Sequence, residues 1–383
     1  MRTCLWAITI SLVASAMPYS AASTYVIVNN DNPAGNSVSV YILDSGGILS
    51  PYKVIATGGT GGGSGDFAWT GQAVTQNASC GFVADTGSND IAAFSEATGF
   101  ARVGNYSNAA LTFAAFGSGI AVAPNGKFLY GAYSGSGNIG AWAINKNCSL
   151  TFLAAYAPSM GTDIDLFLRV TPNDKYLLVA GEFLGRAESY SINQTTGALT
   201  DLGFLDFASA TNTCNGFECF PSGIDITADS KFAVFANAVP TASALSVSIG
   251  TSGLSNAQVW PLGFDLAWAE VPFLSAAAYK GNGNLYFSMS GQSQTLPGVI
   301  TTTFEESGGQ ITIKPYANTP IQNTELGLIA GIASSGDLMV VVEPSNQIDQ
   351  YTIEDGLLFI VDSPTTDSQA YGLTSVSLFP NTR

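Results

Sequence analysis

Short apolar stretches alternate with polar corners along the chain, in a unit that recurs about every fifty residues. Its clearest copies are residues 124–130 (PNGKFLY) and 172–178 (PNDKYLL), and residues 228–234 (ADSKFAV) form a less regular copy. In each copy an apolar run leads into a polar corner, which is followed by a lysine and an aromatic–aliphatic strand. Self-similarity at such a period is typical of repeat architectures, and it predicts the same small unit many times over.

The unit can be traced seven times, and each copy predicts four strands. After the corner strand comes a strand with period-2 alternation, as in residues 37–40 (SVSV), and then a glycine turn into a fourth strand, as in residues 47–49 (GIL). We therefore predict an all-β, seven-bladed β-propeller of four-stranded antiparallel blades. The second strands begin at Tyr25, Cys80, Phe128, Tyr176, Phe232, Leu285 and Leu338.

The two ends of the repeat predict how the ring closes. The unit that begins at Tyr25 has no apolar run before it, whereas residues 371–378 (YGLTSVSL) supply such a run with nothing after it. The C-terminal strand is therefore expected to complete the first blade, which removes the sheet edges that an open array would expose. Residues 23–383 are then one propeller domain.

The amino terminus predicts export. It has one basic residue, Arg2, then an apolar run from Leu5 to Ala16, and small residues at 20–22 (SAA). We interpret residues 1–22 as a signal peptide, because the run is too short to span a bilayer. The mature protein is expected to be secreted or periplasmic, monomeric and without a membrane span.

The charge excludes one class of partner. The chain carries 12 Lys and Arg against 28 Asp and Glu, a formal net charge of −16. Nucleic acid is therefore not an expected partner, because its phosphates require a basic surface. Hydrophobic residues make up 46% of the chain, which is sufficient for a large core.

The cysteines predict two disulfides. Cys4 leaves with the signal peptide, and an even number of cysteines in an exported chain favours disulfides. Cys214 and Cys219 close a short loop, which leaves Cys80 to pair with Cys148. The chain has no histidine, so we expect neither a zinc site nor a Ser-His or Cys-His relay, and no metal or cofactor.

A glycine-rich run at residues 58–65 (GGTGGGSG) invites comparison with phosphate-binding loops. It lacks the Gly-Lys-Ser/Thr of such loops and opens no helix. We predict a flexible connection between two blades.

The repeated units resemble the seven-bladed lactonase-like propellers, which include a bacterial 6-phosphogluconolactonase type and YVTN-repeat proteins. The resemblance covers the whole mature chain, and it implies a carboxylate at Glu182, in residues 181–183 (GEF). It also implies an Arg-His pair and a further Arg, but these positions are Leu166, Phe167 and Ala238. The carboxylate is retained without its cationic partners, which disfavours a phosphorylated sugar as substrate.

Polar residues recur five positions after the start of each second strand, and they should ring one face of the propeller. Connections that enter the same face add further carboxylates and aromatic residues. This ring is either a solvated acidic rim or a mouth for a cation, a cationic ligand or a sugar. The recurring positions are Asn30, Asp85, Tyr133, Gly181 beside Glu182, Asn237, Ser290 and Glu343, and the connections carry Asp163, Asp165, Asp265, Glu270, Glu325, Trp260, Phe264 and Trp268.

From these positions we take Asn30, Asp85, Asp163, Asp165, Asn237, Asp265 and Glu343 as candidate ligand-binding residues. Arg169 and Asp225, on neighbouring innermost strands, are expected to form a structural ion pair.

Two functions remain open. The first is a non-catalytic extracytoplasmic propeller that binds a small molecule or a protein through its loop face. The second is a hydrolase or isomerase acting on a neutral lactone, with Glu182 as the candidate general base.

Overall fold

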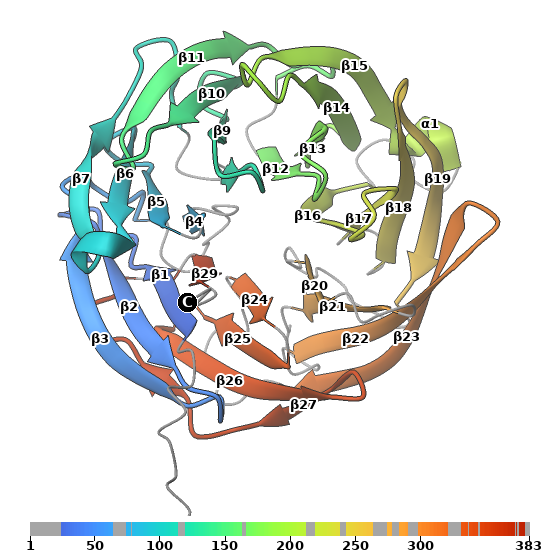
Figure 1. Cartoon of the computed structure of the whole chain (residues 1–383). Coiled ribbons are helices and arrows are strands. Elements are labelled where there is room, and N and C mark those ends of the chain that lie inside the picture. The colour runs from blue at the N-terminus through green and yellow to red at the C-terminus, as the bar shows by residue number, and fades with distance from the viewer. Residues whose placement is uncertain are drawn as a thin grey trace, which may run out of the picture.

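Seven antiparallel sheets surround a central axis in the computed structural model (Figure 1), as the repeat predicts. The structure describes residues 24–63, 74–77, 79–113, 119–162, 166–211, 219–237, 243–262, 274–277, 283–289, 298–320, 331–335, 337–343, 345–371, 373 and 375–379.

The blades follow one another in chain order, and the strands of each blade run from the central axis outward. Blade 1 consists of β29 (Ser375–Phe379), β1 (Thr24–Asn29), β2 (Ser37–Leu43) and β3 (Leu49–Ala56). Blade 2 consists of β4 (Val74–Gln76), β5 (Cys80–Asp85), β6 (Asp90–Ser95) and β7 (Ala101–Tyr106), with the 3₁₀ turn η1 (Glu96–Thr98). Blade 3 consists of β8 (Ile120–Val122), β9 (Phe128–Tyr133), β10 (Asn138–Ile144) and β11 (Leu150–Tyr156).

The remaining blades repeat this order. Blade 4 consists of β12 (Leu166–Val170), β13 (Tyr176–Gly181), β14 (Arg186–Ile192) and β15 (Leu199–Asp206), followed by the short helix α1 (Phe207–Thr211). Blade 5 consists of β16 (Pro221–Ile226), β17 (Phe232–Asn237), β18 (Ser243–Gly250) and β19 (Gly253–Pro261). Blade 6 consists of β20 (Leu274–Ala277), β21 (Gly283–Met289), β22 (Gly298–Ser307) and β23 (Gln310–Pro320). Blade 7 consists of β24 (Gly331–Ser335), β25 (Leu338–Val342), β26 (Gln347–Glu354) and β27 (Leu357–Ile360), with β28 (Thr365–Thr366) paired to β26.

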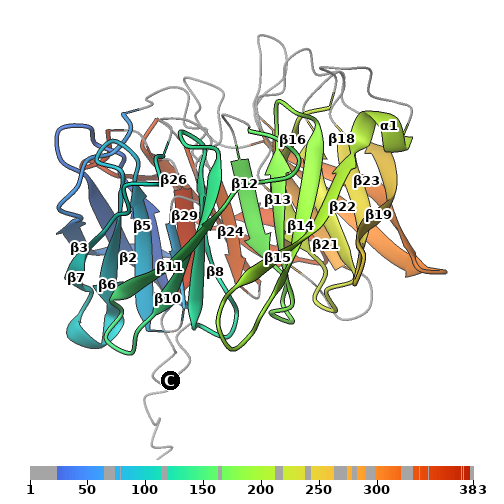
Figure 2. The same ribbon diagram turned by 90° about the horizontal axis from the view of Figure 1, so that it is seen from above.

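The hydrophobic pattern of each strand follows its place in the blade. The second strands β5, β9 and β17 are buried at every position, because neighbouring blades cover both of their faces. The outermost strand β11 alternates between exposed and less exposed positions, because one of its faces meets water. The second strands begin at one face of the ring, the lower face, and end at the other, the upper face. In the side view, α1 lies at the upper face (Figure 2).

The C-terminal strand closes the ring, as predicted. β29 pairs antiparallel with β1, with Tyr25 opposite Phe379 and Ile27 opposite Ser377. Val376 belongs to the same hydrophobic cluster as Val26 and Val28. The first blade is therefore assembled from both ends of the chain.

The polar corner of the repeat links blades 2 to 5 in succession at the lower face. Asn77 Nδ2 donates to the carbonyl of Gly126 at 3.1 Å, from blade 2 to blade 3. One blade further on, the Asn125 N–H donates to Asp174 Oδ1 at 2.8 Å. In the next pair of blades the Asn173 N–H donates to the Ser230 hydroxyl at 3.0 Å. At these three junctions each corner is therefore hydrogen-bonded to the corner of the next blade.

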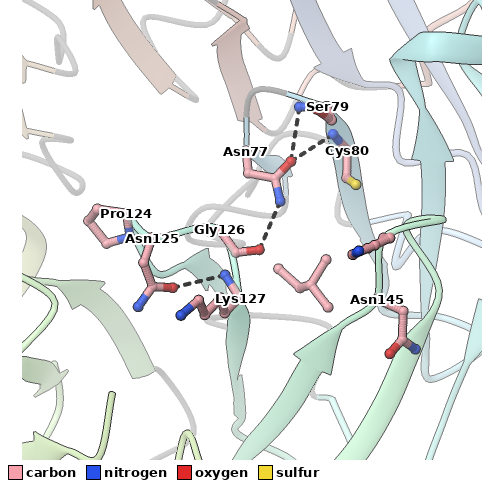
Figure 3. A pocket seen from close by; sticks show the side chains of 10 residues that line it. Asn77, Ser79, Cys80, Pro124, Asn125, Gly126, Lys127 and Asn145 are labelled. Atoms are coloured by element: carbon pink, nitrogen blue, oxygen red, sulfur yellow. Dashed lines mark hydrogen bonds between the residues drawn. The ribbon is translucent and has the colours of Figure 1, made fainter. Parts of the chain in front are cut away.

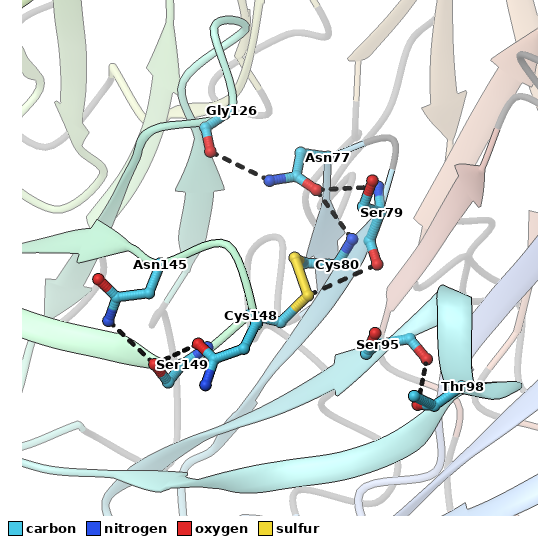
Figure 4. The surroundings of a disulfide bond; sticks show 10 residues. Asn77, Ser79, Cys80, Ser95, Thr98, Gly126, Asn145, Cys148 and Ser149 are labelled. Atoms are coloured by element: carbon cyan, nitrogen blue, oxygen red, sulfur yellow. Dashed lines mark hydrogen bonds between the residues drawn. A yellow bond between two sulfur atoms is a disulfide. The ribbon is translucent and has the colours of Figure 1, made fainter.

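A disulfide joins Cys80 to Cys148, with the two Cα atoms 5.5 Å apart, which confirms that predicted pair (Figure 4). It links the start of β5 in blade 2 to the hairpin that follows β10 in blade 3. Cys219 is also disulfide-bonded, and Cys214, its predicted partner, lies outside the described residues.

Removal of this bond should destabilise the protein. The cysteines are 68 residues apart, and a disulfide over a loop of this size contributes about 2–4 kcal/mol, mainly by restricting the unfolded chain. We expect the double variant Cys80→Ser/Cys148→Ser to unfold at a clearly lower urea concentration than the wild type without reductant. An unchanged midpoint would contradict this expectation.

The predicted signal peptide lies outside the described residues and stays a prediction. Among the described residues, no helix is long and apolar enough to span a membrane.

Candidate functional site

The recurring polar positions at the ends of the second strands are buried beneath the upper face. None of those that the structure describes is more than 1% exposed, so the solvated-rim interpretation does not apply to them. They are Asn30, Asp85, Tyr133, Glu182, Asn237 and Glu343. Ser290 lies outside the described residues.

Asp85 lies at the junction of blades 1 and 2. Asn36, in the loop between β1 and β2, donates its amide to Asp85 Oδ1 at 2.7 Å and to Asn29 Oδ1 at 2.9 Å. Asn105 in β7 donates to Asp85 Oδ2 at 3.4 Å. Burial raises the pKa of Asp85 to about 8, the Asn36 hydrogen bond opposes this rise, and the charge of Asp90 adds to it. Asp85 therefore links two blades through amide groups.

The glycine-rich segment is packed into the same junction. The Gly62 N–H donates to Asp31 Oδ1 at 2.8 Å, and the Thr60 carbonyl accepts from the Gly87 N–H at 3.0 Å. A Cβ atom on Gly61 would clash with the backbone of Asp31. The predicted flexible connection is thus wrong for residues 58–63, because glycine in this segment permits close approach of backbones rather than motion.

Glu343 lies at the corresponding place in blade 7, directly after β25. The Ser345 hydroxyl donates to Glu343 Oε2 at 2.9 Å, and Oε1 has no hydrogen-bond partner within the described residues. Burial raises the pKa of Glu343 to about 8, and the charge of Asp349 in β26 adds to the rise. This carboxyl group is therefore protonated in much of the population at neutral pH.

Glu182 directly follows β13 in blade 4, and its side chain is 1% exposed. Leu166 and Phe167, where the resemblance implies an Arg-His pair, lie on the adjacent strand β12, opposite Gly181 and Ala180. Leu166 is 0% and Phe167 4% exposed, so both fill the hydrophobic core. Both positions thus carry buried apolar side chains instead of the cationic pair that the resemblance implies. Ala238 lies outside the described residues.

The two arginines of blade 4, Arg169 and Arg186, have described contacts with residues other than Glu182. Arg169 Nη2 lies 3.7 Å from Asp225 Oδ1, which confirms the predicted ion pair between β12 and β16. Arg186 Nε lies 3.2 Å from Asp206 Oδ2, and its Nη1 donates to the Met160 carbonyl at 2.9 Å.

One buried carboxylate of blade 4 was not anticipated. Glu188 in β14 is 0% exposed and accepts from the Ser159 N–H at 2.9 Å, the Ser159 hydroxyl at 3.0 Å and the Met160 N–H at 2.9 Å. It holds the connection between blades 3 and 4. A Glu inside a strand pattern would have been the only sequence signal, and it equally suits a solvent-facing position.

The other candidates of the upper face are not all described. Trp260 in β19 is half-buried and donates its indole N–H to the Ser246 hydroxyl at 2.8 Å. Within the described ranges, no three His, Cys, Asp or Glu side chains are placed to hold a metal ion. The candidates outside the described residues are Asp163, Asp165, Asp265, Glu270, Glu325, Phe264 and Trp268.

Comparisons with known proteins agree with this architecture. A family model described as "Lactonase, 7-bladed beta-propeller" matches residues 36–214, slightly less than half of the chain. No curated protein matches the chain.

Solved structures extend the likeness over the whole ring. A putative 6-phosphogluconolactonase from Bacteroides fragilis superimposes with a TM-score of 0.68 at 15% identity, over 94% of this chain and 99% of that one. The periplasmic gluconolactonase of Pseudomonas aeruginosa gives a TM-score of 0.63 at 13% identity, over 93% and 99% of the two chains. At such identities the likeness shows the fold alone. The family match over residues 36–214 and the seven-bladed ring both agree with the predicted resemblance to lactonase-like β-propellers.

Proposed function

We propose that this protein is an extracytoplasmic binding propeller that takes a small molecule or a protein at its upper face, and that it does not hydrolyse phosphorylated sugar lactones. The observation on which this rests is the burial of Leu166 and Phe167 where the enzymes place an Arg-His pair. Without cationic side chains to bind its phosphate, a phosphorylated ligand would be repelled by a protein of net charge −16.

The extracytoplasmic part of the proposal has separate support. The Cys80–Cys148 disulfide requires an oxidising compartment, and the predicted signal peptide would deliver the chain to one. The Pseudomonas aeruginosa protein of similar fold is periplasmic by its description.

One observation favours hydrolysis or isomerisation of a neutral lactone as a second candidate. Glu182 occupies the family's carboxylate position and is buried beneath the upper face. A buried carboxylate can act as a general base when its pKa suits the reaction.

A lactone panel separates the two functions. Gluconolactone and 6-phosphogluconolactone would be assayed with the wild type and with Glu182→Gln. We expect the wild type and Glu182→Gln to hydrolyse both lactones at the rate of buffer alone, because a general base would otherwise contribute at least about 10²-fold.

Two results would contradict the proposal. Turnover of the neutral lactone that disappears in Glu182→Gln would establish the second function. Turnover of the phosphorylated lactone would show that a substrate clamp exists among other residues.

A further inference from the structure

A cavity of about 430 Å³ opens at the lower face, at the opposite end of the second strands from the buried polar positions (Figure 3). Its walls are the corner before β5 in blade 2, the corner before β9 in blade 3 and the hairpin that follows β10. Two lysines, Lys127 and Lys146, belong to its lining. The Cys80–Cys148 disulfide ties two of these walls together (Figure 4).

The two lysines bring two positive charges to the lining of one cavity. In a protein with 28 acidic and 12 basic residues, a lysine has many carboxylates with which it can pair. The ion pairs within the described part of the chain all involve Arg169, Arg186 or Lys231. Lys127 and Lys146 form none with the described residues, although they line the same cavity. Two positive charges that line one cavity both attract an anion placed between them.

The rest of the wall is fixed by its own hydrogen bonds. Asn77 Oδ1 accepts from the N–H groups of Ser79 at 3.0 Å and Cys80 at 2.8 Å. Asn125 Oδ1 accepts from the Lys127 N–H at 2.8 Å. The cavity thus has a defined polar wall, and the lysine ammonium groups remain available as donors.

The described lining lacks two kinds of donor that are common in phosphate sites, a guanidinium fork and a nest of free backbone N–H groups, although lysine also binds phosphate as a point charge. No arginine is among the described residues that line this cavity, and the N–H groups of Asn125, Gly126 and Lys127 already donate to other acceptors. Ile144 and Pro124 add an apolar surface on which a ring can lie.

We infer that this cavity is a binding site for a small hydroxylated carboxylate, with Lys127 and Lys146 as the groups that bind its charge. The site lies on the face opposite Glu182, so it does not depend on the function proposed above. Its ligand class is set by two ammonium groups, amide side chains and a short apolar wall.

The probe is galacturonate, compared with galactose and galactose 1-phosphate as ligands with no charge and with a phosphate charge. Binding would be measured by isothermal titration calorimetry and saturation-transfer NMR on the mature protein at low salt. The variants are Lys127→Gln, Lys146→Gln and the double substitution. Lys175→Gln is the matched control, because Lys175 occupies the same corner in blade 4, is exposed and does not line the cavity.

We expect galacturonate to bind the wild type and Lys175→Gln equally. Each substitution of a cavity lysine should weaken binding about fivefold, and added salt should weaken binding to the wild type. Galactose and galactose 1-phosphate should both bind more weakly than galacturonate. Circular dichroism and the thermal midpoint should be the same for all variants. Failure of galacturonate to bind, equal binding of galactose, tighter binding of galactose 1-phosphate or insensitivity to the double substitution would each overturn the inference.

Discussion

A chain that ends at residue 370 is expected not to fold, because it lacks the strand that closes the ring. Truncation removes β29 and with it five residue pairs to β1. It also removes Leu373 and Val376, which are 0% and 7% exposed and pack against strands of blades 1 and 7. At about 1 kcal/mol for each backbone hydrogen bond, plus the apolar area, the loss is at least about 5 kcal/mol, comparable with the whole stability of a domain.

The measurement is urea denaturation followed by circular dichroism, together with size-exclusion chromatography. A matched control ends after Phe379, so that it retains β29 and loses only residues 380–383. A second variant, Val376→Asp in the full chain, keeps the backbone pairing and introduces a charge into the cluster. We expect the control to match the wild type and Val376→Asp to unfold at lower urea. A truncated chain as stable as the control would show that β29 does not hold the ring closed.

The architecture could be predicted from the sequence because a propeller repeats one local pattern at a fixed spacing. The hydrogen bonds Asn77–Gly126 and Asn125–Asp174 join the corners of successive blades, so the spacing of the corners along the sequence reflects the spacing of the blades. The same spacing places Cys80 at the start of a second strand and Cys148 in the outer hairpin of the next blade, so their pairing could be anticipated as well.

The burial of the polar positions at the upper face could not be predicted from the spacing of the repeat. Their spacing gives the strand ends, but burial depends on which loop of the adjacent blade covers them. Asp85 is covered through Asn36, which lies 49 residues earlier in blade 1. The prediction that the glycine-rich segment is flexible was wrong for a similar reason. Asp31 and Gly87, which hydrogen-bond to the segment, belong to two different blades.

Stability is expected to fall as the pH rises from about 5 to about 8, because of Asp85 and Glu343. Burial raises their pKa values from 3.8 and 4.5 to about 8, so in this window the folded state holds protons that the unfolded state has released. The free energy of unfolding therefore decreases with pH, by up to roughly 1.4 kcal/mol per pH unit for each of the two groups, and levels off above pH 8. The pKa values of Asp206 and Asp229 are lowered, so these groups stabilise the folded state once the unfolded chain is also ionised, above about pH 4. Their contribution is constant between about pH 5 and about pH 8 and does not alter this slope.

Urea denaturation of the mature protein at intervals between about pH 5 and about pH 9 measures the slope. Glu343→Gln removes one of the two titrating groups and keeps the shape of the side chain, so we expect it to remove about half of the slope. Asp85→Asn should act in the same direction, with an added loss of stability at every pH, because the new NH2 group must face either Asn36 or Asn105, whose amides both donate to Asp85. Glu305→Gln, at an exposed position of β22, is the control and should leave the slope unchanged. A slope that survives both Glu343→Gln and Asp85→Asn would mean that other groups produce it. Asp85 and Glu343 would then be ionised inside the folded ring, held by Ser345, Asn36 and Asn105 despite their burial.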